Sequence, residues 1–152
     1  MLSQTTEYAL RLVVQLASHL DQPVTIPELA RTTKIPSGYL AKVLRQLARA
    51  GLVHSQRGPS GGSVLTRAPE AITVLDVVQA VDPLRRIAVC PLGLSTHGAN
   101  LCPLHRRLDD AMATVEEAFR DSSLAEILED PRGSKPLCEG PRLRRPAPGG
   151  RR

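Results

Sequence analysis

The pattern that most restricts the fold lies in residues 25–65, where two helical segments precede an extended stretch and a cluster of glycines. The later of these two segments, which is the third helix expected in the chain, should cover residues 37–50. Apolar residues recur there at helical spacing, and Gly51 follows at the usual C-terminal position. Residues 52–57 and 63–65 have the composition of two strands, and the glycine-rich stretch between them is typical of a hairpin tip. Helix, turn, helix and two-stranded hairpin is the order of a winged helix-turn-helix.

Capping residues indicate where the helices begin, because their side chains accept hydrogen bonds from the first unpaired amides. The predicted N-caps are Thr5 or Thr6, Thr25 with Glu28 as the second member of a capping box, Thr73, and Cys102 followed by Pro103. The helix after Cys102 is expected to run to about residue 120. It carries an apolar stripe of the kind that pairs with a partner helix, formed by Leu104, Leu108, Met112, Val115 and Phe119.

These elements predict a mainly α fold with a small two-stranded β wing and a long dimerisation helix. We expect residues 1–82 to form the winged helix-turn-helix, residues 83–103 an irregular loop, and residues 104–130 the dimerisation helix with a short C-terminal helix. Residues 131–152 contain five Pro, four Gly and six Arg, so a disordered basic tail is expected there. Aromatic residues make up only 2% of the chain, so its core must be aliphatic, which suits packed helices.

Charge and composition narrow the class of protein. Residues 1–67 carry 8 Lys and Arg against 3 Asp and Glu, and a basic module suggests a polyanionic partner. Glu7 and Arg11 interrupt the first apolar stretch, so neither a secretory signal nor a membrane span is expected. Three cysteines without secretory context indicate a reducing cytoplasm. No Cys-x-x-Cys, phosphate-loop, dinucleotide or hydrolase motif is present, so we expect neither an enzyme nor a small-molecule substrate.

The helix over residues 37–50 has one apolar face, expected in the core, and one polar face. Lys and Arg on the polar face can contact phosphates or guanine, and Gln can pair with adenine in the major groove. Arg57 can enter the flanking minor groove from the wing. The predicted DNA-binding residues are Ser37, Tyr39, Lys42, Arg45, Gln46, Arg57, Gly58, Pro59, Ser60 and Gly61. The alternative for the helix alone is a charged face that is merely solvated.

Five stretches of the chain carry a family likeness: Thr6-Glu7-Tyr8-Ala9-Leu10-Arg11, Ile35-Pro36-Ser37-Gly38-Tyr39-Leu40, Gly51-Leu52-Val53, Arg57-Gly58-Pro59-Ser60-Gly61-Gly62 and Ile72-Thr73-Val74-Leu75-Asp76-Val77-Val78. They resemble the IscR/NsrR family of transcription regulators, and the likeness covers residues 1 to about 130. It implies a dimeric winged-helix regulator, usually a repressor, in which a cofactor or sensor loop precedes a long helix that crosses its partner. In this chain that loop corresponds to residues 83–103. The cluster-assembly regulator of that family has a glutamate where this chain has Ala41, so a different operator is expected.

The resemblance also implies a cofactor site. Cluster-binding members of the family have three cysteines spaced six apart, whereas this chain has Cys90 and Cys102, twelve apart, with Thr96 between them. His105 follows three residues after the second cysteine, where some members have a histidine. Glu7 stands where the family's nitric-oxide sensor has an acidic ligand donated by the other subunit. The implied ligands are Cys90, Cys102, His105 and Glu7, with His97 less favoured.

The bound group is open among four alternatives. Two cysteines with a histidine and a carboxylate suit [2Fe–2S] better than [4Fe–4S], and mixed Cys/His ligation raises the reduction potential as a redox sensor needs. Two cysteines and two histidines also satisfy tetrahedral zinc. Without metal, Cys90 and Cys102 can form a reversible disulfide, or both can be inert apolar residues of an interface. As the N-cap of a helix, Cys102 is expected to favour its thiolate form.

The resulting hypothesis is a homodimer on a palindromic double-stranded DNA operator, with each third helix in a major groove and each wing in the adjacent minor groove. Its operator affinity is expected to follow the state of an iron–sulfur cluster that responds to redox state, nitric oxide or cluster supply. The remote alternative is a winged helix that binds another protein, for which a basic third helix is not needed.

Overall fold

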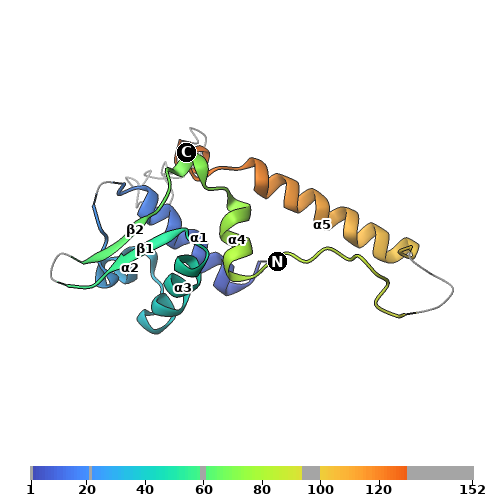
Figure 1. Cartoon of the computed structure of the whole chain (residues 1–152), viewed down its shortest axis with the longest axis horizontal. Coiled ribbons are helices and arrows are strands. Elements are labelled where there is room, and N and C mark those ends of the chain that lie inside the picture. The colour runs from blue at the N-terminus through green and yellow to red at the C-terminus, as the bar shows by residue number, and fades with distance from the viewer. Residues whose placement is uncertain (1, 21, 59–60, 94–99, 130–152) are drawn as a thin grey trace, which may run out of the picture.

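The computed structural model describes residues 2–20, 22–58, 61–93 and 100–129. The elements of this part of the chain are α1 (Gln4–Ala17), α2 (Ile26–Thr33), α3 (Ser37–Arg49), β1 (Val53–Gln56), β2 (Gly62–Leu65), a 3₁₀ turn (Pro69–Ala71), α4 (Val74–Val81), α5 (Pro103–Asp121) and α6 (Leu124–Glu129) (Figure 1). This order confirms the mainly α fold with a two-stranded wing. The predicted tail over residues 131–152 lies outside the described residues, as do Pro59, Ser60, Thr96, His97 and Cys138.

Two of the predicted threonine caps begin their helices. The Thr25 hydroxyl accepts a hydrogen bond from the amide of Glu28 at 3.4 Å at the start of α2. At the start of α4 the Thr73 hydroxyl accepts from the amide of Asp76, and the Asp76 carboxylate accepts from the amide of Thr73, both at 3.1 Å. This reciprocal pair is a complete capping box, which the sequence indicated only by its threonine.

The first helix begins earlier than the sequence predicted. Its N-cap is Ser3, and the Ser3 hydroxyl accepts a hydrogen bond from the amide of Thr6 at 3.2 Å. The prediction of Thr5 or Thr6 as the cap was therefore wrong, because both lie inside the first turn and Thr6 is buried there. At the other end of the molecule Cys102 is the N-cap of α5 and Pro103 its first residue, as predicted.

An aliphatic core lies between α1, α3 and α4. Its side chains come from the inward faces of these helices, and each fully buried leucine or valine contributes about 1.5–3 kcal/mol to folding. The buried core residues of the three helices include Leu12, Val13, Leu16, Leu40, Val43, Leu44, Leu47 and Val77. Burial of the apolar face of α3 leaves its polar face in solvent.

The short helix α6 joins this core from the far end of the chain. The amide of Leu124 donates to the carbonyl of Ile72, and the amide of Val74 donates to the carbonyl of Ser122, both at 2.9 Å. Leu124 is fully buried within the same core cluster. In the structure this helix contacts α1 and the 3₁₀ turn, and its assignment to the dimerisation unit stays a prediction.

The wing is an antiparallel pair in which Gln56 of β1 lies opposite Gly62 of β2. Val24, just before α2, adds a bridge to the wing: its amide donates to the carbonyl of Ser63 at 3.0 Å, and its carbonyl accepts from the amide of Ser63 at 2.8 Å. Val24 therefore ties the wing to the segment that leads into α2.

Two glycines are required by the geometry of the wing tip. Gly58 has φ of 119°, a conformation that residues with a side chain rarely adopt. At Gly61 an added Cβ atom would lie 2.5 Å from the carbonyl oxygen of Gln56. The close return of the chain at the wing tip thus leaves no room for a side chain at Gly61.

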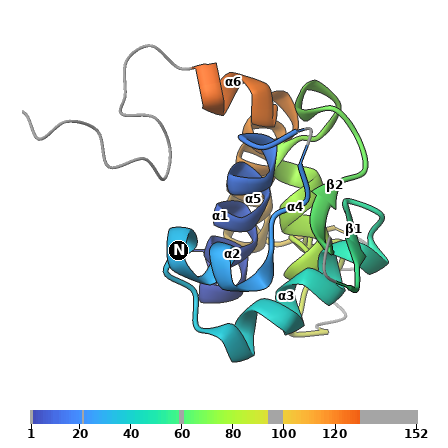
Figure 2. The same cartoon turned by 90° about the vertical axis from the view of Figure 1, so that its left-hand side faces the viewer.

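The helix α5 extends away from the core, and its first turn lies at the end of the molecule opposite the wing (Figure 1). In Figure 2, which looks from the wing side, α5 lies behind α1. None of its 19 residues is fully buried, and Leu104, Leu108 and Val115 are 64%, 48% and 42% exposed. No helix in the described part of the chain is long and apolar enough to cross a membrane. An apolar groove of about 560 Å³ runs along α5. Its lining residues are Leu2, Leu84, Ile87, Leu108, Ala111, Met112, Val115 and Phe119.

Candidate functional site

The helix α3, predicted to be the recognition helix, presents four of its five predicted DNA-binding residues to solvent. Ser37 lies in its first turn, and Tyr39, Lys42 and Arg45 follow on the exposed face. Amides at a helix N-terminus and positive side chains on one face are the groups that contact DNA phosphates and base edges. The exposed face of α3 therefore has the chemistry expected of a helix that binds in the major groove.

Gln46 differs from the other residues of this set. Its side chain is half-buried, and its Nε2 atom donates a hydrogen bond to the carbonyl of Val81 at the end of α4, at 3.4 Å. Its Oε1 atom is buried and has no hydrogen-bond partner among the described residues. In this conformation Gln46 connects α3 to α4, and its reading of a base stays a prediction that requires the side chain to turn outward.

An aromatic pair joins α1 to the recognition helix. The rings of Tyr8 and Tyr39 meet edge to face, with centroids 5.7 Å apart, and the ammonium of Lys42 lies 5.8 Å from the centroid of Tyr39. On the other side, the guanidinium of Arg11 lies 5.9 Å from the centroid of Tyr8. The sequence did not indicate this contact, because α1 and α3 are separated in the chain by α2, and a contact between such helices leaves no periodic signal.

The wing carries Arg57 at its tip, and the contact of this residue with a minor groove stays a prediction. Arg57 is exposed and directly precedes Gly58 at the wing tip, while Gly61 lies on the returning side. A surface hollow of about 750 Å³ separates the start of α2 from the wing and is lined in part by Thr25 and Arg57. A guanidinium beside a helix N-terminus gives this hollow a positive character suited to a phosphate backbone.

Two thiols and one imidazole meet at the first turn of α5. The Sγ atom of Cys102 lies 3.1 Å from Nδ1 of His105, and the Sγ atom of Cys90 lies 3.6 Å from the same nitrogen. All three ligand atoms lie within 4.8 Å of one another. Cys90 is 5% exposed although it lies in an irregular segment. The structure thus brings together three of the predicted ligands.

The three atoms have the chemistry and spacing of a metal site. Zn–S bonds are about 2.3 Å and Zn–N bonds about 2.0–2.1 Å, so two ligand atoms of one ion lie at most about 4.6 Å apart. Small side-chain movements bring atoms that lie within 4.8 Å of one another into that range. Thiolate and imidazole ligands are typical of zinc and of iron–sulfur groups. The set fits either group and lacks a fourth protein ligand among the described residues of one chain.

Glu7 lies elsewhere in the same chain. It is half-exposed in the first turn of α1, and its carboxylate accepts a hydrogen bond from Arg11 at 2.9 Å. The group of possible metal ligands found in one chain contains Cys90, Cys102 and His105 without Glu7. The prediction that Glu7 is supplied by a second subunit therefore stays a prediction.

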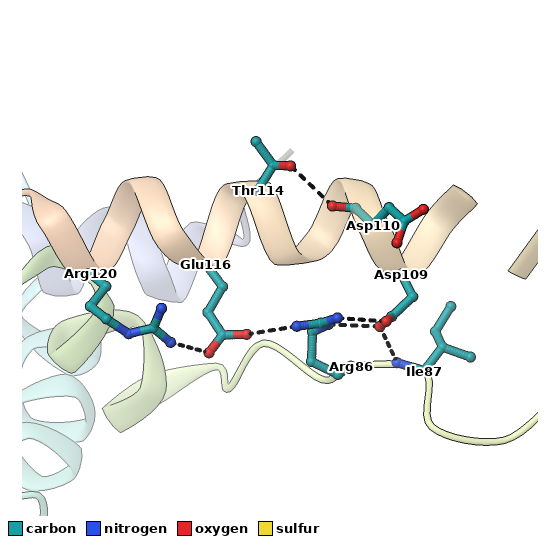
Figure 3. A network of polar contacts seen from close by, with 7 residues as sticks. All are labelled: Arg86, Ile87, Asp109, Asp110, Thr114, Glu116 and Arg120. Atoms are coloured by element: carbon teal, nitrogen blue, oxygen red, sulfur yellow. Dashed lines mark hydrogen bonds and ion pairs between the residues drawn. The ribbon is translucent and has the colours of Figure 1, made fainter. Parts of the chain in front are cut away.

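An ion-pair network holds the segment before Cys90 against α5 (Figure 3). The Asp109 carboxylate accepts hydrogen bonds from Nε and Nη2 of Arg86 at 2.7 and 2.6 Å and from the amide of Ile87 at 2.8 Å. Glu116 lies 3.8 Å from Arg86 and 2.6 Å from Arg120. The hydrogen bonds from Arg86 and then from the Ile87 amide hold the pKa of Asp109 below its ordinary value, and the bond to Asp109 raises the pKa of Arg86.

Comparison with known proteins identifies the family to which the chain belongs. The Rrf2 family model, described as an iron-dependent transcriptional regulator, matches residues 2–130. A protein of Aquifex aeolicus whose name classes it as an HTH-type transcriptional regulator is 30% identical over 129 residues, which are 83% of this chain and 90% of the relative. The HTH-type transcriptional regulator IscR of Yersinia pseudotuberculosis is 29% identical over 130 residues, covering 85% of this chain and 79% of the relative.

A solved structure extends the likeness to three dimensions. CymR of B. subtilis, described as the global cysteine regulator, superimposes with a TM-score of 0.69 at 27% identity, covering 84% of this chain and 95% of CymR. These matches confirm the family resemblance that the sequence motifs indicated. Together with the exposed recognition helix and the wing, they assign the chain to one family. The chain belongs to the Rrf2 family of DNA-binding winged helix-turn-helix transcriptional regulators.

Proposed function

We propose that the chain acts as a homodimer that binds a palindromic operator, represses transcription there, and changes its operator affinity with the state of an iron–sulfur cluster. The observation that carries the proposal is the convergence of Cys90, Cys102 and His105 at one point in the chain. If the two cysteines were inert apolar residues, nothing would favour an imidazole nitrogen 3.1 Å from the Cys102 sulfur and 3.6 Å from the Cys90 sulfur. A ligand set explains that arrangement.

The exposed side of α5 supports the homodimer. Large apolar side chains are costly to leave in water, and Leu104, Leu108 and Val115 lie 42–64% exposed beside an apolar groove. A second copy of α5 has the same stripe, so a two-fold pairing covers both at once. Two recognition helices related by that axis match a palindromic DNA site.

The homodimer also offers a source for the fourth ligand. Within one chain the carboxylate of Glu7 is half-exposed and contacts Arg11, so it can also face another subunit. We propose that Glu7 of each subunit completes the site of the other. Metal binding then requires both chains, which links the state of the site to the geometry of the pair.

The residues of one chain would divide the work at this site. Cys90 and Cys102 would supply two thiolates, and Nδ1 of His105, the nitrogen that faces both sulfurs, would supply the imidazole ligand. A [2Fe–2S] cluster bound there provides one-electron redox chemistry. Oxidation, nitrosylation or loss of the cluster would change how α5 and the segment after α4 pack, and α4 contacts the recognition helix through Gln46.

The same geometry supports a second candidate, a metal-free thiol switch. The two sulfur atoms lie within 4.8 Å of each other, so a disulfide between Cys90 and Cys102 requires only a small approach. Zinc is the third candidate, since two sulfurs, one nitrogen and one carboxylate oxygen satisfy a tetrahedral site. Each candidate has its own spectroscopic and chemical signature.

The test is made on full-length protein purified without oxygen. We expect visible absorbance and a Mössbauer spectrum of cluster iron, lost in Cys102→Ala and kept in Cys138→Ser. Binding to a fragment of the DNA upstream of its own gene, followed by fluorescence anisotropy, should change about 5–150-fold when the cluster is removed. A colourless protein that contains zinc would replace iron with zinc in the proposal.

Two results would reject the proposal outright. Operator affinity that is the same with cluster, zinc, disulfide or reduced thiols would remove the sensing role of the three ligands. Absence of salt-sensitive binding to double-stranded DNA in every one of these states would remove the operator itself, because phosphate contacts make DNA affinity depend on salt.

A further inference from the structure

The segment between α4 and Cys90 lies along α5 without regular secondary structure. Most of its side chains are exposed, and only Leu84 and Ile87 are half-buried between residues 82 and 89. An irregular segment loses conformational entropy when it is held in one place. The free energy gained by partly burying two apolar side chains is too small to offset that loss. Yet Cys90 at the end of this segment is 5% exposed and lies 3.6 Å from His105. Something besides apolar contact must hold it.

We infer that Asp109 is a positioning residue for Cys90: by binding both Arg86 and the amide of Ile87, its carboxylate holds the segment on α5 so that the Cys90 thiol meets Cys102 and His105. The inference deepens the proposed function, and its metal readout rests on that function. The geometric part, the proximity of two thiols, is independent of any metal.

The spacing along the helix supports the assignment. Asp109 lies four residues after His105, so the two side chains share one face of α5, one turn apart. Ile87 lies three residues before Cys90, a distance that extended chain covers in about 10 Å. A hydrogen bond from the Ile87 amide to Asp109 therefore restricts Cys90 to the neighbourhood of His105.

The bonds themselves are of the strong kind. Arg86 meets Asp109 with two parallel hydrogen bonds of 2.7 and 2.6 Å, a charge-assisted pair with defined geometry. The Asp109 side chain is 15% exposed, which reduces screening by solvent. Glu116 contacts both Arg86 and Arg120, so the pair belongs to a network, the situation in which surface ion pairs contribute measurably (Figure 3).

The neighbouring residue provides a matched control. Asp110 carries the same charge on the same helix, but its side chain is exposed and points away from Arg86 in Figure 3. Replacing Asp110 therefore changes the charge of α5 without removing a bond to the segment. Every variant is made in Cys138→Ser protein, so that Cys90 and Cys102 are the only thiols.

The first readout is metal-free. Full-length apoprotein is equilibrated in glutathione buffers, where oxidised glutathione accepts two electrons and two protons from the thiols of Cys90 and Cys102 to give one protein disulfide and two molecules of reduced glutathione. The effective concentration of one thiol at the other follows from the equilibrium. We expect Asp109→Ala to lower it about tenfold, as loosening of a tether does, and Asp110→Ala to leave it unchanged.

Two further variants separate the roles of the carboxylate. Asp109→Asn keeps an oxygen for the Ile87 amide and should show an intermediate fall. Arg86→Gln removes the ion pair but leaves Asp109 in place. This variant keeps the test decisive if Asp109→Ala folds poorly. Circular dichroism on all variants reports the winged domain, which should be unaffected.

The second readout is titration with Co²⁺, followed by thiolate-to-cobalt absorption. Asp109→Ala should raise the dissociation constant for Co²⁺ about tenfold relative to Asp110→Ala. A tenfold change is the lower end of what is seen when a residue that orients a metal ligand is replaced. An unchanged effective concentration in Asp109→Ala and Arg86→Gln, or thiols that are not neighbours in the parent protein, would overturn the inference. No cobalt–thiolate absorption in the parent together with a tenfold fall in effective concentration would reject the metal site and support the role of Asp109.

Discussion

The Sγ atom of Cys102 lies 3.1 Å from Nδ1 of His105, and both residues belong to the start of α5. Three residues of helix separate them, so the contact is set by helix geometry as soon as α5 begins at Pro103. Cys90 reaches the same nitrogen from an irregular segment. One pair of candidate ligands is therefore preformed by local structure, and the position of the third candidate depends on how a distant segment is held.

Replacement of His105 should weaken metal binding more than it changes the fold. The half-exposed imidazole of His105 faces both thiols, so His105→Ala removes one of three ligands without opening the core. We expect the affinity for Zn²⁺ or Co²⁺ to fall at least about tenfold. His54→Ala, in an exposed position of the wing, is the control. Equal metal affinity in the two variants would exclude His105 as a ligand.

Arg57→Ala should weaken operator binding through the wing. Loss of one guanidinium in the minor groove or on a phosphate lowers affinity and reduces the slope of log K against log salt by about 1. The measurement is fluorescence anisotropy at several salt concentrations. Arg107→Ala changes the same charge on α5 and should bind like the parent protein. The wing would have no part in DNA binding if the two variants behaved alike.

A charge in the apolar groove of α5 should separate the subunits. Leu108 is 48% exposed and lines the groove, so Leu108→Asp places a carboxylate where the proposed partner helix packs. Sedimentation velocity should show a monomer. Thr114→Asp introduces the same charge at an exposed residue outside the groove lining and should leave the dimer intact. A dimeric Leu108→Asp protein would place the interface elsewhere.

Two glycine substitutions should change stability in opposite directions. Gly38 lies in the first turn of α3 with nothing within 4 Å of an added Cβ, so Gly38→Ala should stabilise the fold by about 0.5–1 kcal/mol. At Gly61 the added Cβ meets the Gln56 carbonyl, so Gly61→Ala should destabilise the wing. Urea unfolding checks both, and the same sign for the two changes would contradict the structure.

The Asp109–Arg86 pair should resist mild acid. The pKa of Asp109 is lowered in the folded chain by its hydrogen bonds from Arg86 and Ile87, so the stability that it contributes is complete above the ordinary carboxyl pKa of 3.8 and is lost as pH falls through the lower, folded value. The carboxyl carbon shift of Asp109, followed by NMR, should titrate below the ordinary carboxyl pKa of 3.8. An Asp109 that titrates at or above 3.8 would show that the pair does not form in solution.

Local patterns were sufficient for most of the fold. The apolar spacing of Leu40, Val43, Leu44 and Leu47 predicted the buried face of α3, and the glycines at 58, 61 and 62 predicted the wing, because helix periodicity and positive φ are properties of short stretches. The start of α1 was placed wrongly because three hydroxyl residues, Ser3, Thr5 and Thr6, compete for the cap within four positions. Only packing, which buries Thr6, selects among them.

By itself the sequence determined the winged helix-turn-helix, the exposed basic face of α3 and which side chains are able to bind metal, since each depends on residues close together in the chain. The tertiary structure decided the approach of Cys90 to His105, the bond from Ile87 to Asp109 across 22 residues, and the edge-to-face contact of Tyr8 with Tyr39. Such contacts depend on the path that the chain takes between them, and that path follows from burial and hydrogen bonding summed over the whole domain, which no short stretch contains.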